Sequence, residues 1–268
     1  MRKPVLLGSS GITTSRIGVG TSRLHYLRSS DRRRLLDGAF DAGVIHFDTA
    51  PSYGDGLAER ALGAFVRDRR DRVVVATKVG FAADPLIERW PGPAMPLRGL
   101  RAAARKFGFW QSRPLPLTAT AIRGSVEQSL RRMKTGWIDI LFLHEPSLER
   151  LPSPSEAWYE LVKLREEGLV RAFGLAGSWQ PMRPVLSVAP ELGMLVQTAE
   201  AEWSGERLPD ITYGAIATAS QQYWSRSVPE DVARDRLRTA LARRPHGVVL
   251  ISTTRMDHLR HLASVQAQ

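Results

Sequence analysis

Four titratable side chains stand at or just after the ends of three consecutive apolar segments, each with the composition of a buried strand. Asp48 ends the first segment and Tyr53 follows it, Lys78 ends the second, and His144 ends the third. Parallel strands present their carboxyl ends at one edge of a sheet or barrel, so we expect these four side chains to share one site. An acid, a phenol, an amine and an imidazole together predict general acid–base chemistry.

The expected role of each side chain follows from how it titrates. A free tyrosine ionises near pH ~10, and a neighbouring ammonium lowers that pKa. We therefore expect Lys78 to lower the pKa of Tyr53 toward neutrality, with Asp48 holding the lysine in place and His144 polarising a carbonyl oxygen. Taken singly, each residue also fits a structural role, as a turn former, a packing residue, a solvated strand end or a loop histidine. Their combination at three successive strand ends favours a catalytic site.

Eight short runs rich in β-branched or apolar residues predict eight strands. They are Arg16–Gly20, Val44–Asp48, Val73–Lys78, Ile138–His144, Val170–Leu175, Met194–Thr198, Ile211–Ile216 and Gly247–Ser252. Helical stretches separate most of them, although the stretch between the sixth and seventh strands is weak as a helix. Eight strands alternating with helices in 268 residues predict one α/β domain over residues 1–268, a (β/α)8 TIM barrel. An open doubly wound sheet is the alternative, but "GVGTSR" after the first strand lacks the third glycine of a dinucleotide-binding turn.

The connection over residues 79–117 is long for a compact domain and is rich in Pro, Gly, aromatic and basic residues. Loops of this length are usually functional or disordered. Because the connection leaves the third strand beside the expected site, we interpret it as a lid that sets substrate choice. A disordered or partner-binding insertion is the alternative interpretation.

Composition narrows the classes of function. The chain has no cysteine, which excludes disulfides, thiolate metal sites and a cysteine nucleophile. No segment has the pattern of a signal peptide or a membrane span, so we expect a cytoplasmic protein that does not enter membranes. The net charge of +11 attracts anions, but the basic residues are scattered over many helices, so nucleic-acid binding rests on charge alone and is not favoured. A small-molecule substrate is expected, and homo-oligomerisation stays open.

Taken in order along the chain, these motifs resemble the aldo-keto reductase superfamily. "FDTAPSYGDGLAE" is similar to its DTA-x-x-YG signature, "VVVATKVG" to its lysine strand, and "IDILFLHEP" to its strand ending in histidine. The wording is closest to bacterial aldose and pyridoxal dehydrogenase-like members. The resemblance implies Asp48, Tyr53, Lys78 and His144 as catalytic residues, with Tyr53 as the acid/base. It implies NAD(P)H-dependent interconversion of a small aldehyde, ketone or sugar and its alcohol or lactone.

The resemblance also implies a nicotinamide cofactor, with NADP(H) preferred over NAD(H). Gln197 matches the residue that holds the carboxamide, Tyr213 matches the ring that stacks on the nicotinamide, and residues 251–255, "ISTTR", match the loop that binds the 2′-phosphate. The full set of cofactor-binding residues implied in this way is Thr21, Asp48, Gln197, Tyr213, Ser252, Thr253, Thr254 and Arg255.

Several departures from the family pattern leave a second reading open. Ala176-Gly177 stands where the family commonly has Ser-Asn, His261-Leu262 stands where it has Glu-Asn, and the C-terminus is shortened, so we expect no long C-terminal substrate loop. The alternative is therefore a binding or regulatory protein of the same fold, with weak cofactor binding and little turnover. His258 and His261 lie three apart, but we expect no carboxylate to join them, so no metal site is predicted.

Overall fold

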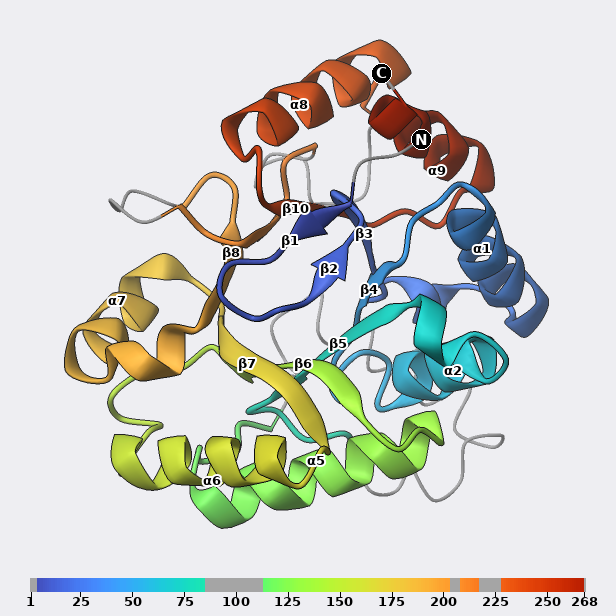
Figure 1. Cartoon of the computed structure of the whole chain (residues 1–268). Helices are drawn as coiled ribbons and strands as arrows, with labels where there is room; N and C mark the ends of the chain where they lie inside the picture. Colours follow the sequence, from blue (N-terminus) through green and yellow to red (C-terminus); the bar gives the residue numbers. More distant parts are fainter. Residues whose placement is uncertain (1–3, 85–112, 203–207, 217–227, 268) are drawn as a thin grey trace.

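The barrel predicted from the sequence is present in the computed structural model, which describes residues 4–84, 113–202, 208–216 and 228–267 (Figure 1). Its eight strands are all parallel and close in the order β10-β3-β4-β5-β6-β7-β8-β9. They are β3 Ile17–Gly20, β4 His46–Asp48, β5 Val74–Val79, β6 Ile138–His144, β7 Val170–Ala176, β8 Leu195–Ala199, β9 Ile211–Tyr213 and β10 Val248–Ile251. Each strand was expected, in this order and within a few residues of these bounds.

Helices surround the barrel and cover its outer face (Figure 1). The α-helices are α1 Ser29–Asp41, α2 Leu57–Val66, α5 Ala119–Met133, α6 Pro154–Glu166, α7 Trp179–Val188, α8 Glu230–Arg243 and α9 Met256–Ala263. Short 3-10 turns are η1 Leu24–Tyr26, η2 Arg70–Arg72, η3 Pro190–Gly193 and η5 Ser264–Ala267. The sequence analysis did not predict α7, because Pro181 and Pro184 obscure its periodicity. In the described residues no helix joins β8 to β9, as the weak pattern there indicated.

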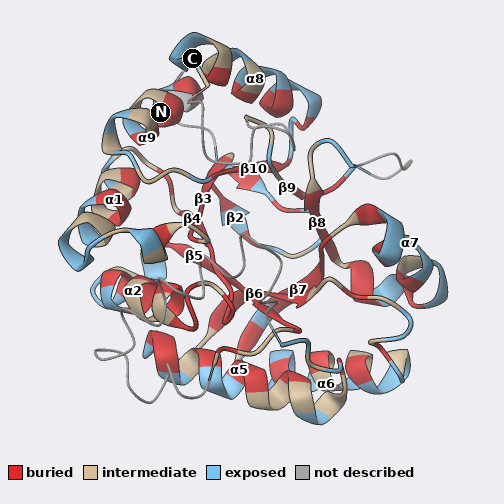
Figure 2. Ribbon diagram, turned by 180° about the vertical axis from the view of Figure 1, so that it is seen from behind, coloured by how far each residue is buried: buried red, intermediate tan, exposed pale blue. Residues whose placement is uncertain are grey.

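The strands are buried on both faces, which is why they read as almost continuous apolar runs (Figure 2). Alternate side chains fill two separate cores, because neighbouring residues of a strand point to opposite faces. Phe142 and Ala172 belong to the core inside the barrel, whereas Leu141 and Phe173 pack in the core that contains buried helix residues such as Phe65. A change of one residue in strand register would exchange the two sets, so the packing fixes the register.

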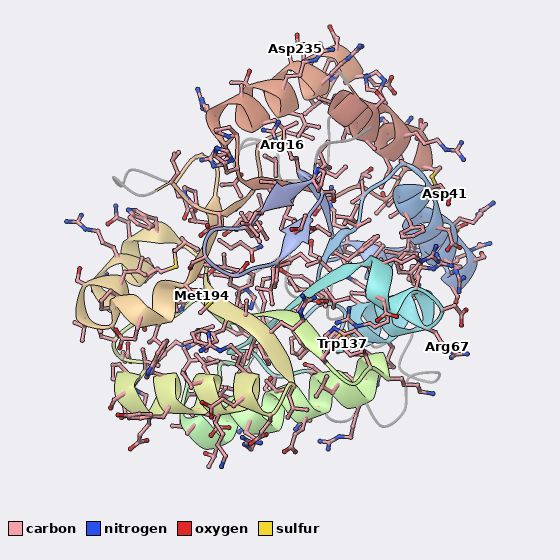
Figure 3. The ribbon with its side chains drawn as sticks, viewed as in Figure 1. Arg16, Asp41, Arg67, Trp137, Met194 and Asp235 are labelled. Atoms are coloured by element: carbon pink, nitrogen blue, oxygen red, sulfur yellow. The ribbon has the colours of Figure 1, made fainter. Side chains whose placement is uncertain are left out.

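An antiparallel hairpin that the sequence analysis did not predict, β1 Val5–Leu6 and β2 Thr13–Thr14, crosses the amino-terminal end of the barrel (Figure 1). Its Val5, Leu7 and Ile12 pack with the inner core of the barrel. Arg16 and Met194, labelled in Figure 3, precede β3 and β8 and lie at this same end. The hairpin therefore covers the amino-terminal end, and the carboxyl ends of the strands lie on the opposite side.

The long connection after β5 is described only at its two ends. Phe81 pairs with Pro114 in an antiparallel bridge, and the Leu115 amide donates a 2.9 Å hydrogen bond to the Gly80 carbonyl. The chain therefore leaves and returns at one place beside β5 and β6. The lid expected over residues 79–117 falls mostly on residues 85–112, which lie outside the described residues. Among the described residues, no helix is long and apolar enough to cross a membrane.

Candidate active site

The ends of β3, β4 and β5 are joined by backbone hydrogen bonds that continue beyond the strands. The Thr21 amide donates to the Asp48 carbonyl at 2.9 Å, and the Thr49 amide donates to the Ala76 carbonyl at 2.8 Å. Lys78 lies two residues further along β5 than Ala76, at the register position of Phe142 on β6. Asp48 and Lys78 are thereby held on adjacent strands at the same rim of the barrel.

Asp48 and Lys78 form a buried ion pair with 2.5 Å between Oδ1 and Nζ. Lys78 also donates to the Thr49 carbonyl at 3.0 Å, and the Gln197 Nε2 donates to the second Asp48 oxygen at 3.1 Å. Burial by itself lowers the pKa of Lys78, but the charges and hydrogen bonds of Asp48 and Tyr53 outweigh it and the pKa rises. Lys78 is therefore a fixed cation at neutral pH.

Tyr53 reaches this pair through a tight turn after β4. Gly54, Asp55 and Gly56 all have positive φ angles, of 59°, 53° and 78°, so three successive residues are in the left-handed region. The turn places the Tyr53 ring with its centre 5.0 Å from the Lys78 Nζ. Asp48 ends the strand and Tyr53 follows five residues later in the turn, so both side chains reach the same lysine, Lys78.

The expected lowering of the Tyr53 pKa is not the net effect. Burial of the phenol raises its pKa, Lys78 lowers it through its charge and a side-chain hydrogen bond, and the charges of Asp48 and Glu145 raise it. The sum is a raised pKa, because burial is the largest of these effects and, together with the two carboxylates, outweighs the lysine. Tyr53 consequently keeps its proton at neutral pH, which is the form that can protonate an oxygen.

His144 lies at the end of β6, with its ring edge-on to Tyr53 at 6.4 Å between ring centres. Burial, followed by the positive charges of Lys78 and Arg150, lowers the pKa of His144 to about 3. The imidazole is therefore neutral in the physiological range. A neutral imidazole can donate a hydrogen bond to a carbonyl oxygen while adding no charge to the site.

Arg150, which the sequence analysis did not identify, holds this part of the rim together. Its guanidinium donates to the carbonyls of His144 at 2.9 Å, Glu145 at 2.7 Å and Leu115 at 3.0 Å, and also to the carbonyl of Gly80. These acceptors come from the ends of β5 and β6 and from the returning end of the long connection. No motif identifies such a residue, because its partners are backbone carbonyls, two of which are 35 and 70 residues away in the sequence.

Gln197 Oε1 and Thr21 Oγ1, near Asp48, are among the buried polar atoms that have no hydrogen-bond partner within the described part of the chain. Both residues are at most 1% exposed. An unpaired buried acceptor or hydroxyl costs free energy, so a pair of them at one rim indicates where the polar groups of a ligand bind. A carboxamide that donates an N–H to Gln197 Oε1 fits this position, so the residues present fit a nicotinamide.

Tyr213 ends β9, and its ring is part of the same electrostatic environment. Burial raises the pKa of Tyr213, and the charges of Glu145 and Glu202 raise it further, so its phenol is neutral. The expected stacking residue therefore presents an uncharged ring that interacts electrostatically with Tyr53 and Asp48.

The expected phosphate-binding loop begins at the end of β10. Ser252 Oγ donates to the Gly20 carbonyl at 3.3 Å, and Thr253 Oγ1 accepts the Arg255 amide at 3.1 Å. The Arg255 guanidinium forms a two-point ion pair with Asp257, with 3.2 Å from Nε to Oδ1. Thr254 is partly buried. Asp257, which was not considered from the sequence, forms an ion pair with the arginine that was expected to bind a phosphate.

The expectation that no carboxylate joins His258 and His261 is wrong. Glu230, at the start of α8, lies 3.7 Å from His258 Nε2 and 3.9 Å from His261 Nδ1. Glu230, Asp257 and His258 also have side-chain ligand atoms within 4.8 Å of one another. The sequence did not reveal this group because α8 and α9 are brought together only by the closing of the barrel.

Comparisons with known proteins agree with this geometry. The sequence profile of the Aldo/keto reductase family matches residues 16–186, more than half of the chain. The chain is 32% identical over 173 residues to D-threo-aldose 1-dehydrogenase of Pseudomonas sp, covering 62% of this chain and 51% of that protein. It is 29% identical over 199 residues to pyridoxal 4-dehydrogenase of Microbacterium luteolum, covering 68% and 58%. These matches span about half the length of the curated relatives.

A solved structure of an aldo/keto reductase from Klebsiella pneumoniae, in complex with NADP and acetate, superposes with a TM-score of 0.71. The two chains are 21% identical, and the superposition covers 99% of this chain and 90% of the other, which is evidence for the fold. A closed parallel barrel with Asp48, Tyr53, Lys78 and His144 at one rim defines a TIM-barrel protein of the kind these comparisons describe. The chain belongs to the aldo/keto reductase family, and the expected likeness to aldose and pyridoxal dehydrogenases is confirmed.

Proposed function

We propose that the protein is an NAD(P)(H)-dependent oxidoreductase that interconverts a small aldehyde, ketone or sugar and its alcohol or lactone. The observation that carries this proposal is the buried Asp48–Lys78 ion pair beside a protonated Tyr53 and a neutral His144. The names of the two curated relatives support a substrate with an aldehyde or sugar hydroxyl group.

Each side chain has a distinct task in carbonyl reduction. His144 donates a hydrogen bond to the carbonyl oxygen and orients it toward Tyr53. Tyr53 gives the proton of its hydroxyl to that oxygen, and in the opposite direction the phenolate takes the proton back. Lys78 stabilises the phenolate left behind, because its ammonium stands 5.0 Å from the ring centre. Asp48 holds the ammonium in position throughout.

The cofactor-binding residues are Thr21, Asp48, Gln197, Tyr213, Ser252, Thr253, Thr254 and Arg255. Gln197 Oε1 accepts the carboxamide N–H, and Tyr213 provides the stacking ring. When bound, the nicotinamide supplies or accepts the hydride. NADP(H) is preferred over NAD(H), because the hydroxyls of Thr253 and Thr254 and the guanidinium of Arg255 suit a 2′-phosphate. The Klebsiella structure that contains NADP supports the same class of cofactor.

The Arg255–Asp257 pair limits this preference. The guanidinium has to exchange Asp257 for the phosphate, and both side chains are more than half exposed, so the exchange is between two solvated partners. A modest preference for NADP(H) is the expected result. A cytoplasmic location and homo-oligomerisation stay predictions from the sequence.

The test combines cofactor binding with turnover. NADPH and NADH are titrated by fluorescence and calorimetry, and a panel of small aldehydes and sugars is then assayed with the tighter cofactor. Binding together with turnover supports the proposal. Binding without turnover of any member of the panel favours the alternative, a binding or regulatory protein. Absence of binding at millimolar cofactor contradicts both the enzyme and its cofactor site.

A further inference from the structure

Glu145, directly after His144, has an unusual backbone conformation at the rim. Its φ is +49°, a left-handed angle that is uncommon outside glycine, asparagine and aspartate. Its amide donates to the Ala176 carbonyl at 2.7 Å, and its own carbonyl accepts the Arg150 guanidinium at 2.7 Å. Such a conformation persists only where neighbouring contacts determine it, and such residues concentrate at functional sites. Here it directs the Glu145 side chain across to the end of β7.

The Glu145 carboxylate occupies the space that a side chain at position 177 would need. Its Oε2 accepts the Ser178 amide at 2.9 Å. A Cβ placed on Gly177 would lie 2.6 Å from that same oxygen and 2.9 Å from the Glu145 Cα, closer than real Cβ atoms come. Gly177 and Glu145 therefore form a matched pair. The carboxylate of Glu145, which follows the neighbouring strand β6, fills the space in which a side chain at position 177 would lie.

The carboxylate lies beside the residues assigned to the nicotinamide, because Gly177, which it contacts, donates its amide to the Gln197 carbonyl at 3.0 Å. Glu145 raises the pKa of Tyr53 and also that of Tyr213, in each case after the larger effect of burial. Asp48, by contrast, is paired with Lys78 at 2.5 Å. Within the described ranges the Glu145 carboxylate forms no salt bridge, although the Arg150 guanidinium, which binds the Glu145 backbone carbonyl, interacts with its charge at longer range. Glu145 is thus a half-buried anion whose charge is available to a ligand.

We propose that Glu145 distinguishes the redox states of the cofactor, binding the oxidised nicotinamide, which is a cation, in preference to the reduced ring, which is neutral. The inference rests on the proposed function, since it requires that a nicotinamide binds near Tyr53 and Tyr213. A carboxylate in a partly desolvated site attracts a nearby positive charge more strongly than it would in water. The same carboxylate does little for a neutral ring. The bound equilibrium is therefore shifted toward oxidised cofactor, which favours carbonyl reduction.

The experiment measures dissociation constants of NADP⁺ and NADPH for wild type, Glu145→Gln and Glu145→Asp at one pH and ionic strength. Glu145→Gln keeps the shape and an acceptor for the Ser178 amide but removes the charge. We expect it to weaken NADP⁺ about tenfold and NADPH less than about threefold. Glu145→Asp keeps the charge, so its ratio of the two constants should stay within about threefold of wild type.

Glu202→Gln is the matched control. Glu202 accepts the Trp179 amide at 3.4 Å and also raises the pKa of Tyr213, but it is exposed to solvent. Water and salt screen an exposed charge, so its loss should change the NADP⁺ to NADPH ratio by less than about twofold. If Glu145→Gln does not fold, Glu145→Ala replaces it, because it also removes the charge and should reduce the preference for NADP⁺ in the same way.

Equal weakening of both redox forms, or no change in either, overturns the role of Glu145 while leaving the proposed function intact. Failure of the wild type to bind either form contradicts the proposed function itself, and the inference with it. An equally large ratio change in the Glu202 control also overturns the inference, because the effect would then be general electrostatics and not a property of the Glu145–Gly177 pair.

Discussion

Lys78 and Asp48 stand 2.5 Å apart with each side chain only 3% exposed, and two further residues of the candidate site contact this pair. Tyr53 lies against the lysine, while Gln197 binds the second oxygen of the aspartate. A buried ion pair adds little net stability, but removal of one partner leaves an uncompensated charge. The main role of the pair is therefore to position the surrounding side chains. Its loss should lower both the free energy of unfolding and the activity.

Asp48→Asn should reduce the free energy of unfolding by about 3 kcal/mol, because the Lys78 ammonium stays buried without its counter-charge. The double variant Asp48→Asn/Lys78→Met removes both charges and should recover much of that loss. Urea unfolding at pH 7 measures both effects. A single variant as stable as wild type, or a double variant less stable than the single one, would show that the pair is not electrostatically coupled in this way.

Acid should destabilise the protein through two buried histidines. Burial first, and then Lys78, lowers the pKa of His46 to about 3, and His144 has a pKa of about 3 for similar reasons. In the unfolded chain these imidazoles take up protons below about pH 6.5, whereas in the folded chain they stay neutral down to about pH 3. The unfolded state therefore binds more protons, and stability falls as the pH drops through this window.

The expected loss between pH 7 and pH 5 is about 2 kcal/mol for each histidine. His46→Asn should remove about half of this pH dependence, as seen by urea unfolding at the two pH values. A wild type equally stable at pH 7 and pH 5 would mean that these imidazoles are not held neutral by the fold. The same depression implies that His144 contributes no ionisation to the rate profile between pH 5 and pH 8.

Cofactor choice should respond in opposite directions to changes at Arg255 and Asp257. Arg255→Ala should weaken NADPH about tenfold and leave NADH within about twofold, since only the phosphorylated cofactor carries the extra anion. Asp257→Asn should tighten NADPH by a few-fold, because it releases the guanidinium from its ion pair. Calorimetric titration of both cofactors measures this. Equal affinity of the wild type for NADPH and NADH would contradict the assignment of this loop.

Arg150 should matter for turnover without touching the reacting atoms. Arg150→Lys loses the planar fork that binds several carbonyls at once, so the ends of β5 and β6 are held less firmly. We expect kcat to fall about tenfold as His144 moves, while the dissociation constant of NADPH stays within about threefold. Arg131→Lys, at an exposed site on α5, is the matched control and should leave both quantities unchanged. A loss confined to cofactor binding would be inconsistent with a positioning role.

The sequence predicted the barrel and the residues that meet at its rim because both follow from local patterns. Apolar runs mark the strands, and a polar residue at each strand end marks the rim, so Asp48, Lys78 and His144 could be located without coordinates. Arg150 and Glu145 could not, since their partners are backbone atoms of other strands. The direction of the Tyr53 pKa shift was also beyond local reasoning, because it depends on how far burial outweighs the effect of Lys78.

The most direct test of the account is the activity of Tyr53→Phe with a reactive aldehyde, such as a nitrobenzaldehyde, and saturating NADPH. Removal of the hydroxyl removes the proton donor, and general acid catalysis of this kind contributes about 10²–10⁴-fold. Tyr159→Phe, at a residue 70% exposed, is the matched control. The account predicts that Tyr53→Phe binds NADPH with wild-type affinity and loses at least about a hundredfold in kcat, while the control loses neither. Retention of most of the turnover by Tyr53→Phe would contradict it.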